Sequence, residues 1–318
     1  MVNRFPEPFH QFPGNMALGA IAAGEGIEIG EQIAERQAAV QARELRSVGV
    51  NWDLAPVVDV NNNPDNPIIG VRSYGEDPDV VGRLGAAAIA GLQNDGVLAC
   101  AKHFPGHGDT TADSHLSLPT FRGVSERLNS VELAPFRAAI AAGVGSIMTA
   151  HIALPQIDPA PAAPLRSPTN GDSASVTLPA TLSHRILTDL LRNELMFKGL
   201  VVTDAMEMAG VAARYTAGAS AVLAVKAGAD MILKTPDTDG VLRAIKQAVE
   251  VGHLRADTDP MQLVFVLQAF VLSVHFNTRL MHNKDSITRA RAGFTQLVNA
   301  YRAPAQSPIR LAPRNRNV

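Results

Sequence analysis

The densest group of polar side chains is the segment KHFPGHGDTTADSH at residues 102–115, which holds three histidines and two aspartates. Asp113 and His115 lie two positions apart, so their side chains leave the same side of an extended loop. A carboxylate beside an imidazole fixes its tautomer and raises its pKa, so the histidine can donate and later accept a proton near neutral pH. The pair predicts an acid–base site, with a structural hydrogen bond inside the loop as the alternative.

The same histidines raise the question of a metal site. Their spacing matches no compact set of ligands, and Gly106 and Gly108 indicate a mobile loop rather than a rigid cage. We therefore expect no metal ion in this segment.

Asp204 is the second candidate for chemistry. It ends the apolar run VVTD at residues 201–204, where packing gives no reason for a carboxylate. A carboxylate at a strand end serves as a nucleophile or a metal ligand, or it caps the helix that follows. The residue alone does not choose between these roles.

Short apolar runs alternate with helical patterns along most of the chain. The predicted strands cover residues 50–60, 98–104, 145–152, 199–203 and 229–234. The predicted helices cover residues 17–48, 79–95, 125–142 and 239–251, with one more capped by Ser183 and one that ends near Ala227. Continuous apolar strands separated by helices indicate a parallel sheet that is buried on both faces.

Polar residues gather where each predicted strand ends. They are Asp59, Lys102 with His103, His151, Asp204 and Lys234. A doubly wound sheet would concentrate such residues at one switch point, whereas a β/α barrel carries its chemistry at every strand end. The predicted fold class is therefore α/β, an incomplete (β/α)8 TIM-type barrel with about five of its eight strands in this chain. The other strands are expected upstream of Met1.

Three segments resemble glycoside hydrolase family 3, and within it the bacterial β-N-acetylglucosaminidases. Residues 102–115 are similar to the acid/base loop of that family, VVTDAMEM at 201–208 to its nucleophile strand, and GVRSYGEDP at 70–78 to its sugar-binding loop. The likeness runs from Met1 to about His253, with the elements in the expected order. Family 3 β-glucosidases lack this long loop, so a β-glucosidase is the less favoured function within the family.

The resemblance implies roles for particular residues. Asp204 would be the nucleophile and His115 the general acid/base, with Asp113 as its partner. The residues that would hold sugar hydroxyls are Arg4, Arg72, Lys102 and His103. The implied reaction releases a terminal β-linked N-acetylglucosamine with retention, in two displacement steps and without a cofactor. The acceptor is left open between water and phosphate, because a neutral base repels anions less than a carboxylate does.

A non-catalytic protein that binds sugar or self-associates is the rival function. Missing strands would leave unpaired sheet edges and exposed apolar surface, which favours a loss of activity. The intact Asp113, His115 and Asp204 favour an enzyme.

The last part of the chain departs from the family pattern. We expect a partial barrel at residues 1–254, a helical extension at 255–301 and a disordered basic tail at 302–318. The extension distantly resembles the last helices of TetR-type transcriptional regulators. Its very apolar segment Pro260–His275 is the expected surface for self-association.

Five further residues carry predictions of their own. Asp59 is expected to cap a loop rather than to contact sugar, and His107 to shape the acid/base loop. His151 either lines the pocket or is a structural histidine with both ring nitrogens satisfied. Trp52 is expected in the core, with a sugar-stacking platform as the alternative, and Cys100 is expected as a buried thiol.

The resemblance implies a carbohydrate substrate, and composition argues against nucleic-acid and membrane partners. The 318 residues carry a formal net charge of −2, so no nucleic-acid footprint is expected. No apolar run reaches the roughly 18 residues of a membrane span, and the first residues show no signal peptide. The single cysteine fits a reducing compartment, so a cytoplasmic location is expected.

Overall fold

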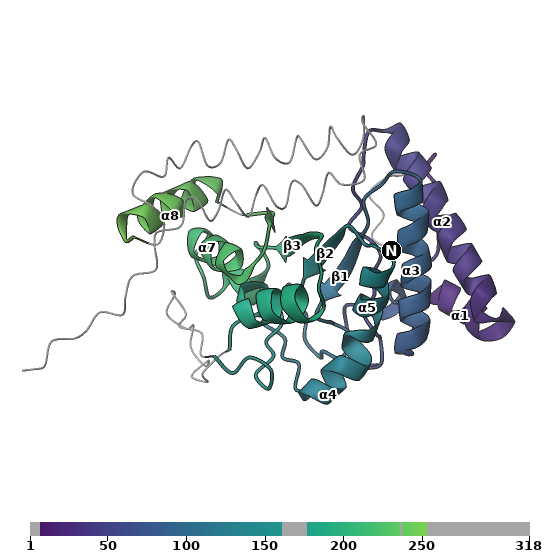
Figure 1. Ribbon diagram of the computed structural model, residues 1–318, viewed down its shortest axis with the longest axis horizontal. Helices are drawn as coiled ribbons and strands as arrows, with labels where there is room; N and C mark the ends of the chain where they lie inside the picture. Colours follow the sequence, from purple (N-terminus) through teal and green to yellow (C-terminus); the bar gives the residue numbers. More distant parts are fainter. Residues whose placement is uncertain (1–6, 161–176, 236, 253–318) are drawn as a thin grey trace, which may run out of the picture.

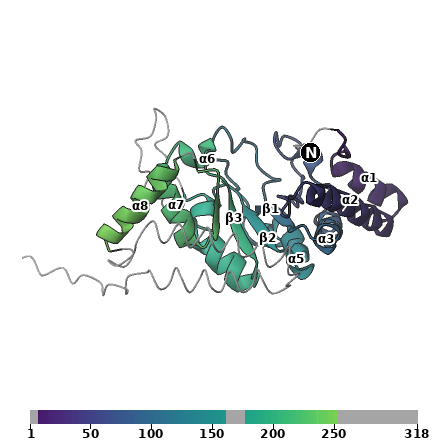
Figure 2. The ribbon, with the colours of Figure 1, turned by 90° about the horizontal axis from the view of Figure 1, so that it is seen from above.

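The computed structural model describes residues 7–160, 177–235 and 237–252. Within these residues a parallel sheet of four strands, in the order β1, β2, β3, β4, is flanked by helices (Figure 1 and Figure 2). The strands are β1 (Cys100–Phe104), β2 (Ser146–Thr149), β3 (Leu200–Ala205) and β4 (Met231–Leu233). Spatial order follows chain order, and helical segments join each strand to the next, as in successive units of a β/α barrel.

Successive residues of the central strands point to opposite faces of the sheet. Ile147 of β2 packs into a large core, whereas its neighbour Met148 joins a small apolar cluster on the other face. All four residues of β2 are buried. The prediction of a parallel sheet with two buried faces is therefore confirmed.

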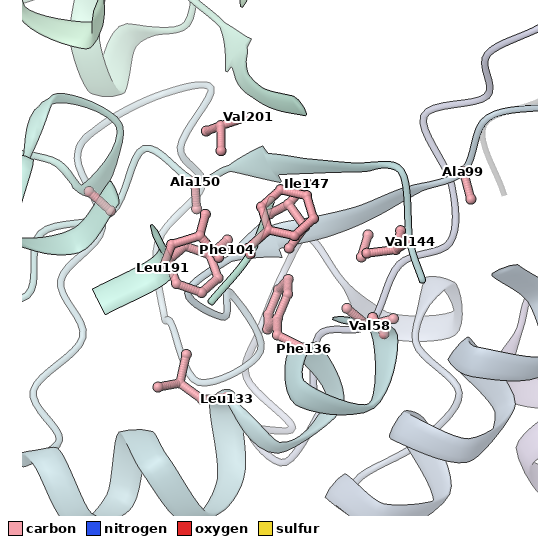
Figure 3. Close-up of a cluster of buried hydrophobic side chains, with 14 of the residues drawn as sticks. Val58, Ala99, Phe104, Leu133, Phe136, Val144, Ile147, Ala150, Leu191 and Val201 are labelled. Atoms are coloured by element: carbon pink, nitrogen blue, oxygen red, sulfur yellow. The ribbon is translucent and has the colours of Figure 1, made fainter. Parts of the chain in front are cut away.

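Helices cover the sheet face that carries the large core. In chain order the helical segments are α1 (Met16–Glu25), α2 (Ile27–Ser47), η1 (Gly70–Arg72), α3 (Pro78–Asn94), α4 (Ser125–Arg127), the π-helical η2 (Leu128–Glu132), α5 (Ala134–Ala141), η3 (Ala180–Leu182), the π-helical η4 (Arg185–Glu194), α6 (Ala209–Ala212), α7 (Ala217–Ala227) and α8 (Thr238–Glu250). Figure 3 shows Phe136 of α5 pointing into this core, and its ring meets Phe104 edge to face at 5.2 Å between centroids. None of the described helices is long and apolar enough to cross a membrane.

The predicted helix at residues 17–48 is two helices, so this prediction was wrong. Gly26 separates α1 from α2 with φ at 107°, a conformation that glycine adopts without strain. Helical spacing continues on both sides of Gly26, so the apolar pattern alone does not reveal the turn.

The predicted helix at residues 125–142 is also divided, into α4, η2 and α5. Pro135 lies at the start of α5 and has no amide proton to continue the backbone ladder. The cap predicted at Ser183 is confirmed, because its Oγ accepts a hydrogen bond from the Ile186 amide at 3.1 Å.

The predicted strand at residues 50–60 is not a regular strand. It lies parallel to β1, with one isolated bridge from Val57 to Lys102 in β1 and another from Trp52 to Leu98 just before it. Pro56 lacks an amide donor, which interrupts the ladder in the middle of the segment. The five predicted strand segments are thus four regular strands and one irregular neighbour of β1.

Four predictions concern residues outside the described part of the chain. They are the sugar-binding role of Arg4, the helical extension at 255–301, self-association through Pro260–His275, and the tail at 302–318.

Candidate active site

Polar residues predicted at the strand ends lie together at the carboxyl edge of the sheet. Lys102 and His103 belong to the end of β1, His151 follows β2, and Asp204 lies near the end of β3. Parallel strands place these ends at one edge. Lys102, His103 and His151 all act electrostatically on the Asp204 carboxyl, so the structure brings them into one site.

The Asp204 carboxylate is set up to be ionised. Burial raises its pKa, whereas His103 and His151 lower it. The Ala205 amide, which donates to Oδ1 at 2.7 Å, and Lys102 lower it further, so the pKa of Asp204 lies below its ordinary value. An ionised carboxylate at a strand end is what a nucleophile requires. Asp204 does not cap a helix, since α6 begins only at Ala209.

Asp59 is fully buried and holds the N-terminal part of the 102–115 segment, at His103 and His107. Its Oδ2 lies 2.7 Å from Nδ1 of His103, and its Oδ1 accepts from the amides of His103 and His107 at 3.2 and 2.7 Å. Burial raises its pKa, and the neighbouring His103 and His107 outweigh that effect, so the pKa of Asp59 is lowered. The predicted role in holding a loop is confirmed.

Arg72 and Lys102 flank His103. Nη2 of Arg72 lies 3.3 Å from Nε2 of His103. Because arginine only donates, Nε2 of His103 is the acceptor in this contact, and Nδ1 is the nitrogen that faces Asp59. Burial lowers the pKa of Lys102, and the nearby Asp204 carboxylate opposes that shift. Three of the four predicted sugar ligands therefore lie in one polar group beside Asp204.

His107 organises the loop between His103 and His115. Its Nδ1 lies 2.7 Å from Oγ1 of Thr110, and its Nε2 lies 3.1 Å from Oγ of Ser114. Burial lowers the pKa of His107 to about 4, so the ring is neutral near pH 7. With both ring nitrogens engaged inside the loop, His107 shapes the loop, as predicted.

Asp113 and His115 form the predicted pair. Oδ1 of Asp113 lies 2.8 Å from the His115 amide nitrogen and 2.8 Å from Nδ1 of its ring. The side chain of His115 is 62% exposed and that of Asp113 is 32% exposed. Burial of Asp113 raises its pKa, but its hydrogen bonds to His115 and the electrostatic effects of His115 and His107 together lower it by more, so the carboxylate is favoured. This geometry leaves Nε2 of His115 for proton exchange with a bound molecule.

The loop that carries this pair docks on the segment that follows β3. The amide of Gly210 in α6 donates to the carbonyl of Ser114 at 3.0 Å. A Cβ at Gly210 would lie 3.2 Å from that carbonyl oxygen and 3.1 Å from Cβ of His151. Glycine therefore permits a close approach between the acid–base loop and the chain that follows Asp204.

His151 is a structural histidine, which settles the alternative left open by its position. Its Nδ1 lies 2.8 Å from Oγ1 of Thr181 and its Nε2 lies 3.0 Å from the carbonyl oxygen of Ala205. Burial lowers its pKa. The ring supports the end of β3 beside Asp204.

Of the two remaining core predictions, that for Cys100 is confirmed, whereas Trp52 is only partly buried. Trp52 packs against the small cluster, and its Nε1 donates to Oγ of Ser146 at 2.9 Å. Cys100 is fully buried, and burial raises the pKa of its thiol to about 12.

Sequence reasoning missed three residues of the site. Burial raises the pKa of Asp53, which interacts with Lys102, and a carboxylate inside the run NWDLA was a usable signal. Asn66 donates to the carbonyls of His107 and Gly108, at 2.8 and 3.0 Å, but nothing in its sequence context indicates this contact. The third is Ser114, which contacts His107 through Oγ and Gly210 through its carbonyl.

No three His, Cys, Asp or Glu side chains in the described part of the chain are placed to share a metal ion.

Comparison with known proteins places this geometry in a family. Residues 1–267 match the glycosyl hydrolase family 3 N terminal domain. Beta-hexosaminidase A of Pseudoalteromonas piscicida is 41% identical over 233 residues, which cover 73% of this chain and 37% of that protein. The beta-N-acetylglucosaminidase/beta-glucosidase of Cellulomonas fimi is 37% identical over 233 residues, which cover 72% of this chain and 39% of that protein.

A solved structure agrees with these relatives. The family 3 beta-N-acetylglucosaminidase from Paenibacillus sp. str. FPU-7 superposes with a TM-score of 0.71 at 39% identity, covering 97% of this chain and 50% of that chain. The chain thus spans half the length of these relatives or less. The N-terminal domain of the family has a TIM-barrel-like α/β fold, which confirms the predicted fold class. The chain therefore belongs to glycoside hydrolase family 3.

Proposed function

We propose that this chain carries the catalytic site of a retaining glycosidase that releases terminal β-linked N-acetylglucosamine. Asp204 is the nucleophile, and His115 with Asp113 is the acid–base pair. One observation carries the proposal: an ionised, largely buried Asp204 lies near the end of β3, and the loop that presents His115 is hydrogen-bonded to Gly210 of α6, on the segment that follows β3. The relatives named for this activity support the substrate class.

In the first step, an oxygen of Asp204 attacks the anomeric carbon and the glycosidic bond breaks. His115 gives the proton on Nε2 to the departing oxygen, while Asp113 stabilises the ring through Nδ1. A covalent glycosyl ester on Asp204 results. The low pKa of Asp204 suits this step, because the attacking group must carry no proton.

In the second step, the now neutral His115 takes a proton from water, and the hydroxide that forms displaces Asp204 from the anomeric carbon. The two inversions together retain the configuration. Arg72, Lys102 and His103 lie beside Asp204, and we assign them to the sugar hydroxyls. Asp59 fixes His103, so the donors are oriented before substrate arrives.

Chromogenic substrates test the proposal. The purified chain is assayed with p-nitrophenyl N-acetyl-β-glucosaminide and, in parallel, with the corresponding β-glucoside. The N-acetylglucosaminide should be turned over, and Asp204→Asn should reduce kcat by at least about a thousandfold. The matched control is Asp189→Asn, an exposed carboxyl on η4, which should retain activity.

Turnover no faster than that of Asp204→Asn would reject the enzyme, and sugar binding without turnover would support the rival sugar-binding role. Faster cleavage of the glucoside would shift the substrate class to glucosides. The acceptor is read from the product: free N-acetylglucosamine in phosphate buffer indicates hydrolysis, and its 1-phosphate indicates phosphorolysis.

A further inference from the structure

Glu132 of η2 is a buried carboxyl that the reaction above does not use. Its side chain is only 2% exposed, and Oε2 has no hydrogen-bond partner among the described residues. Oε1 accepts from Nε of Arg127 at 3.2 Å. A buried acid with a single partner needs an explanation, because desolvation of a carboxyl is costly.

Arg127 connects Glu132 to the acid–base loop. While its Nε donates to Glu132, its Nη2 donates to Oδ2 of Asp109 at 3.3 Å. Asp109 lies in the loop, between His107 and Thr110. One guanidinium thus joins a fixed, buried carboxyl on η2 to a carboxyl of the loop.

The loop also packs against the Cβ and Cγ atoms of Glu132. Gly106 has φ at 132°, and a Cβ there would lie 2.7 Å from Cβ and 2.9 Å from Cγ of Glu132. The loop is therefore held by Asp59 at its root and by Gly210 near its far end. Between these two points, Asp109 of the loop is bound by Arg127, and Gly106 packs on the side chain of Glu132.

We propose that Arg127, oriented by Glu132, is a positioning residue that tethers the acid–base loop through Asp109 and thereby sets the placement of Asp113 and His115. The proposal rests on the function proposed above for that loop, and it adds a regulatory consequence through the protonation of Glu132.

Ionisation of Glu132 couples this tether to pH. Burial raises the pKa of Glu132 to about 7, with Asp109 raising it further and Arg127 opposing the shift. Because the docked loop buries Glu132, docking favours the protonated acid. Docking of the loop is therefore strongest below pH 4.5, the ordinary pKa of a glutamate. It weakens as the pH rises from there through about 7, the pKa of Glu132 in the folded chain.

Hydrogen–deuterium exchange of the whole chain, without substrate, tests the tether. Protection factors are compared for amides at residues 106–116 and, as an internal reference, for amides of α3. Arg127→Met should lower loop protection by about fivefold and leave α3 unchanged. Arg122→Met, an exposed arginine on the same connection, is the matched control and should change neither.

Unchanged loop protection in Arg127→Met would overturn the proposal. If that variant loses α3 protection as well, Asp109→Asn decides, because it removes only the loop side of the contact and should loosen the loop in the same way. Unchanged protection in Asp109→Asn would then overturn the tether.

Glu132→Gln isolates the effect of pH. The amide retains an oxygen for Arg127 but does not ionise. Loop protection in the wild type should fall between pH 5.5 and pH 8, and the variant should remove most of that fall. Equal falls in the two proteins would show that Glu132 does not couple the loop to pH.

The exchange experiment is independent of turnover. A tethered loop in a protein that cleaves no glycoside would contradict the proposed function alone. Turnover, together with loop protection that is unchanged in Arg127→Met and Asp109→Asn, would contradict the tether alone.

Discussion

At the scale of single residues, the site is built on buried charges that support exposed ones. Asp59 accepts three hydrogen bonds from His103 and His107, and through them it fixes both the end of β1 and the start of the loop that carries Asp113 and His115. His151 in turn supports the backbone beside Asp204. The groups that would react owe their placement to neighbours that do not react.

Asp59→Asn should therefore cost stability in a pH-dependent way. At pH 7 we expect the free energy of unfolding to fall by about 2–4 kcal/mol, since the amide cannot satisfy the buried His103 ring as the carboxylate does. The pKa of Asp59 is lowered in the folded chain. Its stabilisation is thus present above the unfolded value near 4 and is lost as pH falls through the folded value.

Urea unfolding at pH 7 and at pH 3 measures this difference. The gap between wild type and Asp59→Asn should narrow at the lower pH. Asp95→Asn, which removes a surface pair with Arg43, should cost less than about 1 kcal/mol at pH 7. A gap that does not change with pH would show that ionisation of Asp59 is not what stabilises the fold.

The candidate residues for chemistry could be chosen from the sequence, whereas their supports could not. Asp204 was recognisable because a carboxylate closes an apolar strand, and Asp113 with His115 because of their spacing. Asn66 acts on residues far along the chain, and Glu132 packs against the distant Gly106, which no local pattern encodes. Asn66 contacts residues 41 and 42 positions away.

At the scale of elements, close helix packing depends on small residues. A Cβ at Gly91 of α3 would lie 2.2 Å from the carbonyl oxygen of Glu35 in α2 and 2.9 Å from Cβ of Ala38. Gly24 in α1 has nothing within 4 Å of its virtual Cβ. Glycine is therefore required for the close contact between α2 and α3 at position 91, but not at position 24.

The two alanine substitutions should have opposite effects. Gly91→Ala should lower the free energy of unfolding by about 1–3 kcal/mol, because α2 must move away from α3. Gly24→Ala should raise it by about 0.5–1 kcal/mol, because alanine favours the helical backbone more than glycine does and the added methyl group meets no obstacle. Thermal unfolding of both variants beside the wild type measures the signs, and equal shifts would contradict the packing argument.

The order of elements could be predicted from the sequence, but their interruptions could not. Apolar periodicity located all four strands and most helices, since burial imposes it. It does not report backbone freedom at Gly26 or the missing amide donors of Pro56 and Pro135. Those three residues divide two predicted helices and interrupt one predicted strand.

At the scale of the whole molecule, the sheet separates a large core from a small one. The large core combines residues from nearly every described helix with one face of the strands. The small cluster contains Cys100, Met148 and Val202, with Trp52 packed against it. Since β1 to β3 contribute to both cores, the two sides should unfold together.

Phe136 and Trp52 test that coupling across the sheet. Phe136 is fully buried in the large core (Figure 3), and Trp52, the only tryptophan, reports from the opposite face. Phe136→Ala should lower the free energy of unfolding by about 3–5 kcal/mol. If the sheet is one cooperative unit, Trp52 fluorescence in urea should report the whole loss of free energy of unfolding, although the two side chains do not share a cluster.

The control is Val48→Ala, at a half-exposed position. It should shift the same transition by less than about 0.5 kcal/mol. A Trp52 transition that stays in place while helical circular dichroism is lost earlier would mean that the two faces of the sheet unfold separately.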